Sequence, residues 1–270
     1  MYFNDAAAVQ YGCTREEFEA LGPYGWVPDD DLVNIPARID LIRERGSRLF
    51  ASRGPDRDGM PVHTEVNARL VATPEGEIVV SIVRDVTERV LLENGIHHLA
   101  FHDRLTGAAN RAKLEDDLQI AVRSADRYDD LVGVVYLDLD DFKPVNDQLG
   151  HAVGDRVLCE VTRRMAACVR ECDTVARLGG DEFLVLISRL STREDLALVA
   201  RKVEQEIERP VVVGENEIRV KASVGLAVYR PGELQEDLIT RADHAMYHAK
   251  QAGVPGWEAF LAESADVGWL

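Results

Sequence analysis

The sequence predicts two domains: an α+β domain over residues 1–84 and an α/β domain with a buried sheet over residues 99–262. A helix over residues 85–98 joins them, and a short tail follows over residues 263–270. Three observations support this division. The chain has 270 residues, enough for two domains of ordinary size. Short strands and helices alternate in the first part. From Leu99 onward, long apolar strands alternate with helices, as is typical of α/β domains.

The composition is that of a globular, acidic protein. Hydrophobic residues make up 46% of the chain and charged residues 29%. Lys and Arg number 31 against 48 Asp and Glu, which gives a formal net charge of -17. Such a surface repels nucleic acid and anionic membranes, so we expect neither as a partner. The alternative is that the charge serves solubility alone.

The sequence gives no sign of a membrane segment or of an oxidising environment. No apolar run approaches 18 residues, and the N-terminus has no signal-peptide pattern, so we expect no membrane span. The four cysteines form no CxxC pair and no zinc pattern, which fits the reducing cytoplasm. Cys168 and Cys172, four apart on a predicted helix, are expected to pack as small hydrophobic side chains.

Local signals define the elements of the first domain. Asn4 turns the chain into the first helix, and Thr14 with Glu17 three residues later forms a capping box for the second. An acidic turn at residues 28–31 precedes the third helix. Two strands of alternating polarity then form a hairpin around residues 73–76. The expected helices cover residues 5–11, 16–21 and 32–44, and the expected strands cover residues 63–70 and 77–85.

The segment from residue 85 to about residue 103 is predicted to be a connecting helix. Leu92, Ile96 and Leu99 have the spacing of a coiled-coil seam, although Gly95 interrupts it. The seam is only about one heptad long, so a helix that packs on its own domain explains it nearly as well as a dimeric coiled coil.

A cluster of carboxylates follows the strand expected at residues 131–137. Asp138, Asp140 and Asp141 come directly after this apolar run. Carboxylates at the end of a buried strand are costly unless a cation or hydrogen-bond donors meet them. The alternative is a helix N-cap, since a helix follows. One aspartate suffices for a cap, so three in four positions favour a metal site.

Gly179 and Gly180 separate two further strands, expected at residues 174–178 and 183–187. Two glycines make a tight hairpin and leave bare backbone that a phosphate could approach. Asp181 and Glu182 would stand beside Asp138 if the two strands that carry these residues are neighbours. Oxygen-only ligands of this kind suit Mg²⁺ or Mn²⁺ bridging nucleotide phosphates.

The first domain resembles a PAS sensor domain. The resemblance rests on short matches in the expected order, at residues 4–7, 11–18, 28–30, 57–59 and 85–89. The PAS family usually has one more strand before Tyr2, so either the chain is shortened or another segment completes the sheet. The resemblance implies a ligand pocket on the sheet. The ligand is not identified, and we expect neither haem nor flavin.

The second domain resembles the GGDEF diguanylate cyclases. It contains the full signature, Gly179-Gly180-Asp181-Glu182-Phe183. Further matches stand in the correct order at residues 102–107, 110–111, 138–155, 222–225 and 242–250. The resemblance implies a central, mostly antiparallel sheet flanked by helices, as in palm-like nucleotidyl cyclases. It also implies a homodimer that condenses two GTP molecules into cyclic di-GMP, with the connecting helix transmitting a signal from the sensor.

The resemblance also implies roles for individual residues. Asp138 and Asp181 would ligate magnesium together with the carbonyl of Leu139. Glu182 would support the second metal or help to activate the 3′-hydroxyl. Gly179 and Gly180 would line the substrate site.

A second set of residues would hold the nucleotide. Asn146 and Asp155 would bind the guanine edge, with His151 in the same stretch; the alternative for Asn146 and Asp155 is loop and helix capping. Lys143 and Lys250 would neutralise phosphate charge.

Arg170 and Asp173 resemble the family's product-inhibition site, which Arg201 would complete from a neighbouring helix. The alternative is a surface ion pair of little energy. One departure concerns residue 254, a valine where the family usually has an arginine that assists phosphate binding. It leaves a second hypothesis open: a domain that senses GTP or cyclic di-GMP without turnover. A PAS interaction scaffold, a third class, would leave the acidic and glycine residues unexplained.

Overall fold

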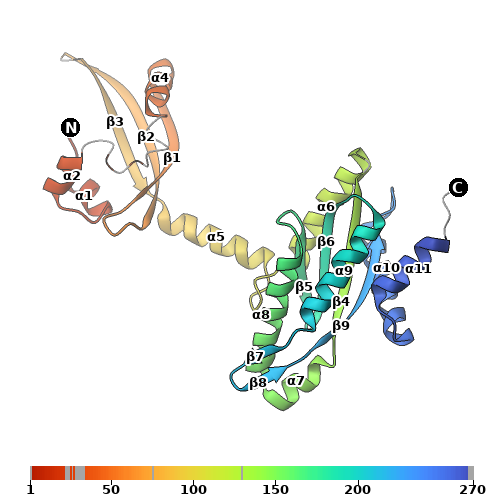
Figure 1. Cartoon of the computed structure of the whole chain (residues 1–270). Coiled ribbons are helices and arrows are strands. Elements are labelled where there is room, and N and C mark those ends of the chain that lie inside the picture. Colours follow the sequence, from red (N-terminus) through yellow and green to blue (C-terminus); the bar gives the residue numbers. More distant parts are fainter. Residues whose placement is uncertain are drawn as a thin grey trace. The chain divides into compact units, whose positions relative to one another are not determined.

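The computed structural model describes residues 2–21, 25, 27, 34–74, 76–128 and 130–266. The chain divides into two compact units, Met1–His97 and His98–Leu270, which are described separately (Figure 1). Within the described residues, no helix is both long and apolar enough to cross a membrane.

The N-terminal unit contains three described helices and an antiparallel sheet of order β1-β2-β3. Its first two helices begin within one residue of the predicted positions. The side chain of Asn4 accepts a hydrogen bond from the Ala7 N–H, and Thr14 and Glu17 form both hydrogen bonds of the predicted capping box. These elements are α1 (Asp5–Gln10), α2 (Arg15–Leu21), α4 (Ile35–Arg45), β1 (Ser47–Pro55), β2 (Pro61–Thr73) and β3 (Gly76–Asp85).

Two predictions for this unit need correction. The sequence predicted two strands, and the structure has a third, β1, which pairs with β2 along its whole length. Its sequence is polar apart from Leu49 and Phe50 near the start, so its alternation is weak. The third helix begins at Ile35 rather than at residue 32. The turn predicted at residues 28–31 lies outside the described residues.

The strand β3 is exposed along its entire length. It pairs with β2 on one side only, and every residue in it is exposed, including Val80 (47%) and Ile82 (70%). The connecting helix is α5 (Thr87–Phe101). Its apolar side chains Leu92, Ile96 and Leu99 are all more than half exposed.

The C-terminal unit is built on a four-stranded antiparallel sheet of order β5-β6-β4-β9. Two interior strands, β4 and β6, have the most apolar sequences, as predicted from their continuous apolar runs. A separate hairpin joins β7 and β8. The strands are β4 (Leu131–Asp140), β5 (Thr174–Gly179), β6 (Glu182–Leu190), β7 (Val211–Val213), β8 (Asn216–Ile218) and β9 (Lys221–Val228).

Helices cover both faces of this sheet. Alternate residues of β4 point to opposite faces: Val135 and Leu137 pack with residues of α8 and α9, whereas Val134 and Tyr136 pack with residues of α6 and α10. The helices are α6 (Arg111–Tyr128), α7 (Phe142–Leu149), α8 (His151–Cys168), α9 (Arg193–Ile207), α10 (Gln235–Ala252) and α11 (Gly256–Asp266).

Two glycines let helices lie directly on β9. A Cβ at Gly225 would come within 2.1 Å of the Ala242 carbonyl oxygen in α10. A Cβ at Gly256, the first residue of α11, would come within 1.7 Å of the Val224 carbonyl oxygen. Because both contacts are with backbone atoms, only glycine fits at either position.

The prediction that Cys168 and Cys172 lie on the same helix was wrong. The helix α8 ends at Cys168, which is buried, and Cys172 lies in the following turn with its side chain exposed. All four cysteines are free thiols.

Candidate functional site

The signature turn lies beside the end of β4. Asp138 pairs with Glu182 in the β4–β6 register, and the Leu139 N–H donates to the Asp181 carbonyl at 3.2 Å. The two strands that carry the acids are therefore neighbours. Gly179 (φ 152°) and Gly180 (φ 54°) form the turn, and a Cβ on either would meet nothing within 4 Å. The turn thus presents bare, accessible backbone.

An arginine behind the turn holds it in place. Arg177 on β5 donates to the Gly180 carbonyl through Nε (3.0 Å) and Nη2 (2.7 Å). Its Nη1 contacts Asp103 Oδ1 at 3.0 Å, and that carboxylate also accepts two hydrogen bonds from Thr106. Burial opposes ionisation of Asp103, but these hydrogen bonds lower its pKa below the usual value. Sequence reasoning missed this pair, although Asp103 lies in a stretch that matches the family.

Lys250 is the cation at the end of β4. Its Nζ lies 2.7 Å from Asp138 Oδ1 and 2.9 Å from Asp140 Oδ1. Ser223 on β9 donates to the same oxygen of Asp140 at 2.8 Å. The hydrogen bond to Asp138 raises the pKa of Lys250, burial opposes this, and Asp140 reinforces it. Lys250 reaches this position because α10 packs directly against Gly225 of β9. The sequence did not single out Asp140 and Ser223 as partners of this lysine.

Helix capping does not explain the carboxylates at the end of β4. Asp141 occupies the N-cap position of α7, but its side chain makes no capping hydrogen bond. It is the one described non-glycine residue with positive φ, at 51°. Asp138 and Asp140 instead bind Lys250. The local arrangement is that of two carboxylates converging on a positive charge.

The donor chemistry of this end of the sheet suits a hard divalent cation. The ammonium of Lys250 marks the point where the oxygens of Asp138 and Asp140 converge, and Asp181 lies one backbone hydrogen bond from Leu139. Among the described residues, no group of three or more histidine, cysteine, aspartate or glutamate side chains is arranged to hold a metal. Further ligands would have to be backbone carbonyls or substrate phosphates, as is usual for Mg²⁺.

The predicted nucleotide-contacting residues lie where α7 packs on α8. Gly154 leaves room for Asn146, whose Oδ1 would stand 1.9 Å from a Cβ at that position. Asp155 follows on α8, with His151 one turn earlier. Asn146 and Asp155 both lie inside helices and cap neither, because Asp141 and Gly150 are the N-cap residues. The structure therefore brings Asn146 to the beginning of α8, and the side chain of Lys143 on α7 is exposed.

An open groove of about 700 Å³ runs along α8 from Asp155. Leu105 and Cys159 line one side and β7 lines the other. The Cys159 thiol donates to the Leu105 carbonyl at 3.2 Å. Asp155 thus stands at the edge of a surface depression, with apolar residues of β7 opposite.

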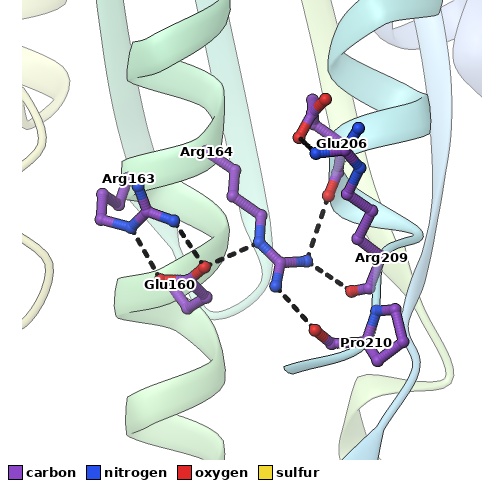
Figure 2. A network of polar contacts seen from close by, with 6 residues as sticks. All are labelled: Glu160, Arg163, Arg164, Glu206, Arg209 and Pro210. Carbon is purple, nitrogen blue, oxygen red and sulfur yellow. Dashed lines mark hydrogen bonds and ion pairs between the residues drawn. The ribbon is translucent and has the colours of Figure 1, made fainter. Parts of the chain in front are cut away.

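A polar network fixes the β7 wall of this groove (Figure 2). Arg164 on α8 donates to the backbone carbonyls of Glu206, Arg209 and Pro210, at the end of α9 and before β7. Its Nε donates to Glu160, which also binds Arg163. The hydrogen bonds from Arg163, opposed by burial and reinforced by Arg164, lower the pKa of Glu160 to about 2. The largely buried guanidinium of Arg164 therefore ties α8, α9 and the segment before β7 together.

Two of the three residues predicted for product inhibition share one turn. The carboxylate of Asp173 accepts the backbone N–H groups of Arg170 (3.0 Å) and Ser188 (3.1 Å). The surface ion pair between Arg170 and Asp173 does not form in the described structure, and the side chain of Arg170 is exposed. The structure does not bring Arg201 to this turn: its guanidinium lies 5.1 Å from the ring centroid of Trp257 on α11.

Comparison with known proteins places the second unit in a family. The model of the family described as "Diguanylate cyclase, GGDEF domain" matches residues 100–255, more than half of the chain. The chain is 45% identical over 160 residues to the bifunctional diguanylate cyclase/cyclic di-GMP phosphodiesterase MucR of Pseudomonas aeruginosa. That match covers 59% of this chain and 23% of MucR.

Two further similarities extend the comparison. An uncharacterized signaling protein of Caulobacter vibrioides is 34% identical over 240 residues, or 86% of this chain and 29% of that protein. The coiled coil and GGDEF domain of DgcB from Caulobacter crescentus, solved in complex with c-di-GMP, superposes with a TM-score of 0.57 and 28% identity. That match covers 62% of this chain and 90% of the other. The chain spans less than a third of the length of either curated relative.

Proposed function

The chain belongs to the family of diguanylate cyclase GGDEF domains, and we propose that it condenses two GTP molecules into cyclic di-GMP with release of two pyrophosphates. One observation carries the proposal: the signature turn lies beside Asp138, so that bare glycine backbone and carboxylates meet at one end of the sheet. This combination suits a nucleotide triphosphate with its divalent cation.

The residues divide the work by position. The backbone of Gly179 and Gly180 would lie along the phosphates. Asn146 and Asp155 would hydrogen-bond the guanine edge, with the ionised carboxylate of Asp155 as an acceptor only and His151 nearby. Lys143 and Lys250 would offset phosphate charge. Most of the rate enhancement in such a site comes from positioning and charge neutralisation.

Asp138, Asp181, Glu182 and the Leu139 carbonyl would hold Mg²⁺ or Mn²⁺. The bound metal would stabilise the attacking 3′-oxygen and the leaving pyrophosphate. The contribution of the protein is to keep these ligands in register, which Arg177 supports by holding the Gly180 carbonyl. Glu182 would also help to activate the 3′-hydroxyl.

The active species is proposed to be a homodimer. Each GGDEF domain holds one GTP, so the two substrates would meet only when two domains face each other across a two-fold axis. The exposed apolar side chains of α5 support this, because in the described structure Leu92, Ile96 and Leu99 have no apolar surface to cover them. A coiled coil between two copies of α5 would bury them.

The N-terminal unit is proposed to be a PAS-like sensor. Its small antiparallel sheet with helices on one side and the order of its sequence matches support this assignment. The domain boundaries proposed are residues 1–84 for the sensor, 85–98 for the helix and 99–262 for the cyclase. Its signal would set the relative pose of the two cyclase domains.

The turn at Arg170 and Asp173 is proposed to bind the product. Asp173 already fixes the backbone of the turn, which leaves the guanidinium of Arg170 exposed for a guanine or phosphate group. Arg201 would have to leave Trp257 to take part. Arg170→Ala should relieve product inhibition, whereas an unchanged inhibition curve would remove the feedback proposal.

The test of the proposed activity is incubation of the purified protein with GTP and Mg²⁺, followed by chromatography for cyclic di-GMP. Product is expected with the natural sequence and not with Asp181→Ala, while both proteins remain folded by circular dichroism. Undiminished turnover by Asp181→Ala would contradict the metal assignment.

Val254 favours one alternative, a domain that binds GTP or cyclic di-GMP without turnover. The chain passes from α10 through Val254 directly into α11, and the arginine usual in the family is absent. Tight GTP binding without product, on the same folded sample, would support this alternative over the cyclase.

A further inference from the structure

The N-terminal unit contains a cavity of about 650 Å³ between its helices and its sheet. Most of the lining is apolar or aromatic. Phe3, Tyr11 and Phe18 form a cluster on one wall, with ring centroids 4.8 Å apart for Phe3 and Phe18 and 6.0 Å apart for Tyr11 and Phe18. This size and lining are typical of sites for small molecules.

One polar group on the wall of the cavity lacks a partner. Gln10, the last residue of α1, lines the cavity, and its Nε2 is buried without a hydrogen-bond partner in the described structure. Buried side-chain donors without partners are rare in native proteins, so each one requires an explanation. An acceptor on a bound molecule would supply the missing hydrogen bond.

Two other polar side chains of the lining are hydrogen-bonded within the protein. Thr64 is 3% exposed, and its hydroxyl donates to the Ser52 carbonyl at 3.4 Å. Tyr11 forms a side-chain hydrogen bond with Thr64, which partly offsets the rise in its pKa that burial causes. A ligand would therefore find its hydrogen-bond donor at Gln10 rather than at these hydroxyls.

The charges around the cavity argue against a cationic ligand. None of the described residues that line the cavity is acidic, so nothing there would balance a cation. The single charged residue of the described lining is Arg38, whose guanidinium lies over the ring of Phe50 at 4.8 Å. Aromatic and aliphatic walls favour a planar apolar body.

We infer that this cavity binds a small, planar molecule that carries no positive charge and has a hydrogen-bond acceptor, such as a ring ketone, and that Gln10 Nε2 donates to that acceptor. The functional meaning of this binding rests on the proposed sensor role, in which the bound molecule would be the signal that the N-terminal unit detects. The binding itself depends only on the cavity and on Gln10.

A matched pair of probes tests the inference on the full chain. 1-Tetralone and tetralin have the same two-ring skeleton, and only the ketone has an acceptor. Their affinities would be measured by ligand-detected NMR titration. We expect tetralone to bind at least about tenfold more tightly, a ratio that corresponds to about 1.4 kcal/mol.

Three variants separate the hydrogen bond from the cavity. In Gln10→Leu the preference for tetralone should disappear while tetralin still binds. In Gln119→Leu, which makes the same change at an exposed position on α6, the preference should remain. In Ala68→Leu, which adds volume at a buried residue of the cavity wall, both probes should bind more weakly.

Two results would overturn the inference. Equal affinities of the two probes for the natural sequence would contradict the proposed hydrogen bond from Gln10. No binding of either probe at 1 mM to protein that is folded by circular dichroism would remove the cavity as a site. GTP turnover measured on the same samples distinguishes the proposals: probe binding without turnover contradicts only the cyclase, and turnover without probe binding contradicts only this inference.

Discussion

The two sheets of this protein bury similar apolar sequences to different extents. In the C-terminal unit, Val134 and Val185 are fully buried because helices cover both faces of the sheet. In the N-terminal unit, β3 is richer in valine and isoleucine than β4 or β6, yet Val80 is 47% exposed and Ile82 is 70% exposed. An apolar run therefore predicts a strand without showing whether its faces are covered. Within the described residues, the core of the C-terminal unit is closed and the outer strand of the N-terminal sheet is not.

The largest effect is expected where the closed sheet meets a helix. Gly225→Ala would place a Cβ 2.1 Å from the Ala242 carbonyl oxygen and 2.2 Å from the Met246 nitrogen, so α10 would have to move off β9. We expect a loss of about 3 kcal/mol in the unfolding free energy of the C-terminal unit, measured by urea denaturation. Gly95→Ala on α5, which meets nothing within 4 Å, is the control and should be neutral or slightly stabilising. A Gly225→Ala protein of unchanged stability would contradict the close contact.

A matched pair of valine substitutions tests the comparison directly. Val185→Ala in β6 removes fully buried methyl groups and should cost about 2 kcal/mol. Val80→Ala in β3 removes exposed ones and should change stability by less than about 0.5 kcal/mol. The free energy of unfolding of each variant is the measurement. A large cost at Val80 would show that something covers β3 in solution.

The charged end of the closed sheet should respond to metal. Lys250→Gln removes the cation between Asp138 and Asp140, and because Lys250 is partly exposed the metal-free protein should lose no more than about 1 kcal/mol. Mn²⁺, followed by electron paramagnetic resonance without nucleotide, should then bind several-fold more tightly. The control is Lys113→Gln, which removes an ion pair with Asp117 outside the site. Its Mn²⁺ affinity should equal that of the natural sequence, and equal affinities for all three proteins would contradict competition between Lys250 and the metal.

The smallest expected effect is a pH dependence of the unfolding free energy, caused by Glu160 in the network of Arg164. Since the folded pKa of Glu160 is about 2, against an ordinary value of 4.5, its ionised form stabilises the fold above about pH 4.5. This contribution disappears as the pH falls from 4.5 towards 2, because the folded protein must then take up a proton that the unfolded chain binds more readily. Unfolding free energies at pH 5, 4 and 3 should decline less steeply for Glu160→Gln. Parallel declines would assign the acid sensitivity to other carboxylates.

Much of the fold followed from local signals in the sequence. The capping box at Thr14 and Glu17 and the glycine turn at Gly179 each depend on residues close in sequence, and each forms as predicted. The apolar strand expected at residues 131–137 also forms, but it continues to Asp140. The strand β1 was missed because its position is decided by pairing with β2 rather than by its own apolar content.

The contacts within the site were harder to predict because they join distant residues. Lys250 meets Asp138 only because α10 rests on Gly225, and Arg177 meets Asp103 only after β5 is placed in the sheet. A sequence pattern identifies residue types that suit a phosphate or a metal, but it does not show which charge neutralises which. For the same reason, the roles of Asn146, Asp155 and Arg201 stay predictions.

The ammonium between Asp138 and Asp140 would make the proposed metal loading an ion exchange rather than a simple addition. A divalent ion that displaces Lys250 from the carboxylates adds one net positive charge to that point instead of two. The displaced side chain stays tethered to α10, within reach of the place where triphosphate oxygens would arrive. Without a metal, Lys250 keeps the two carboxylates from repelling one another, and on the proposed loading the same charge would become available for the substrate.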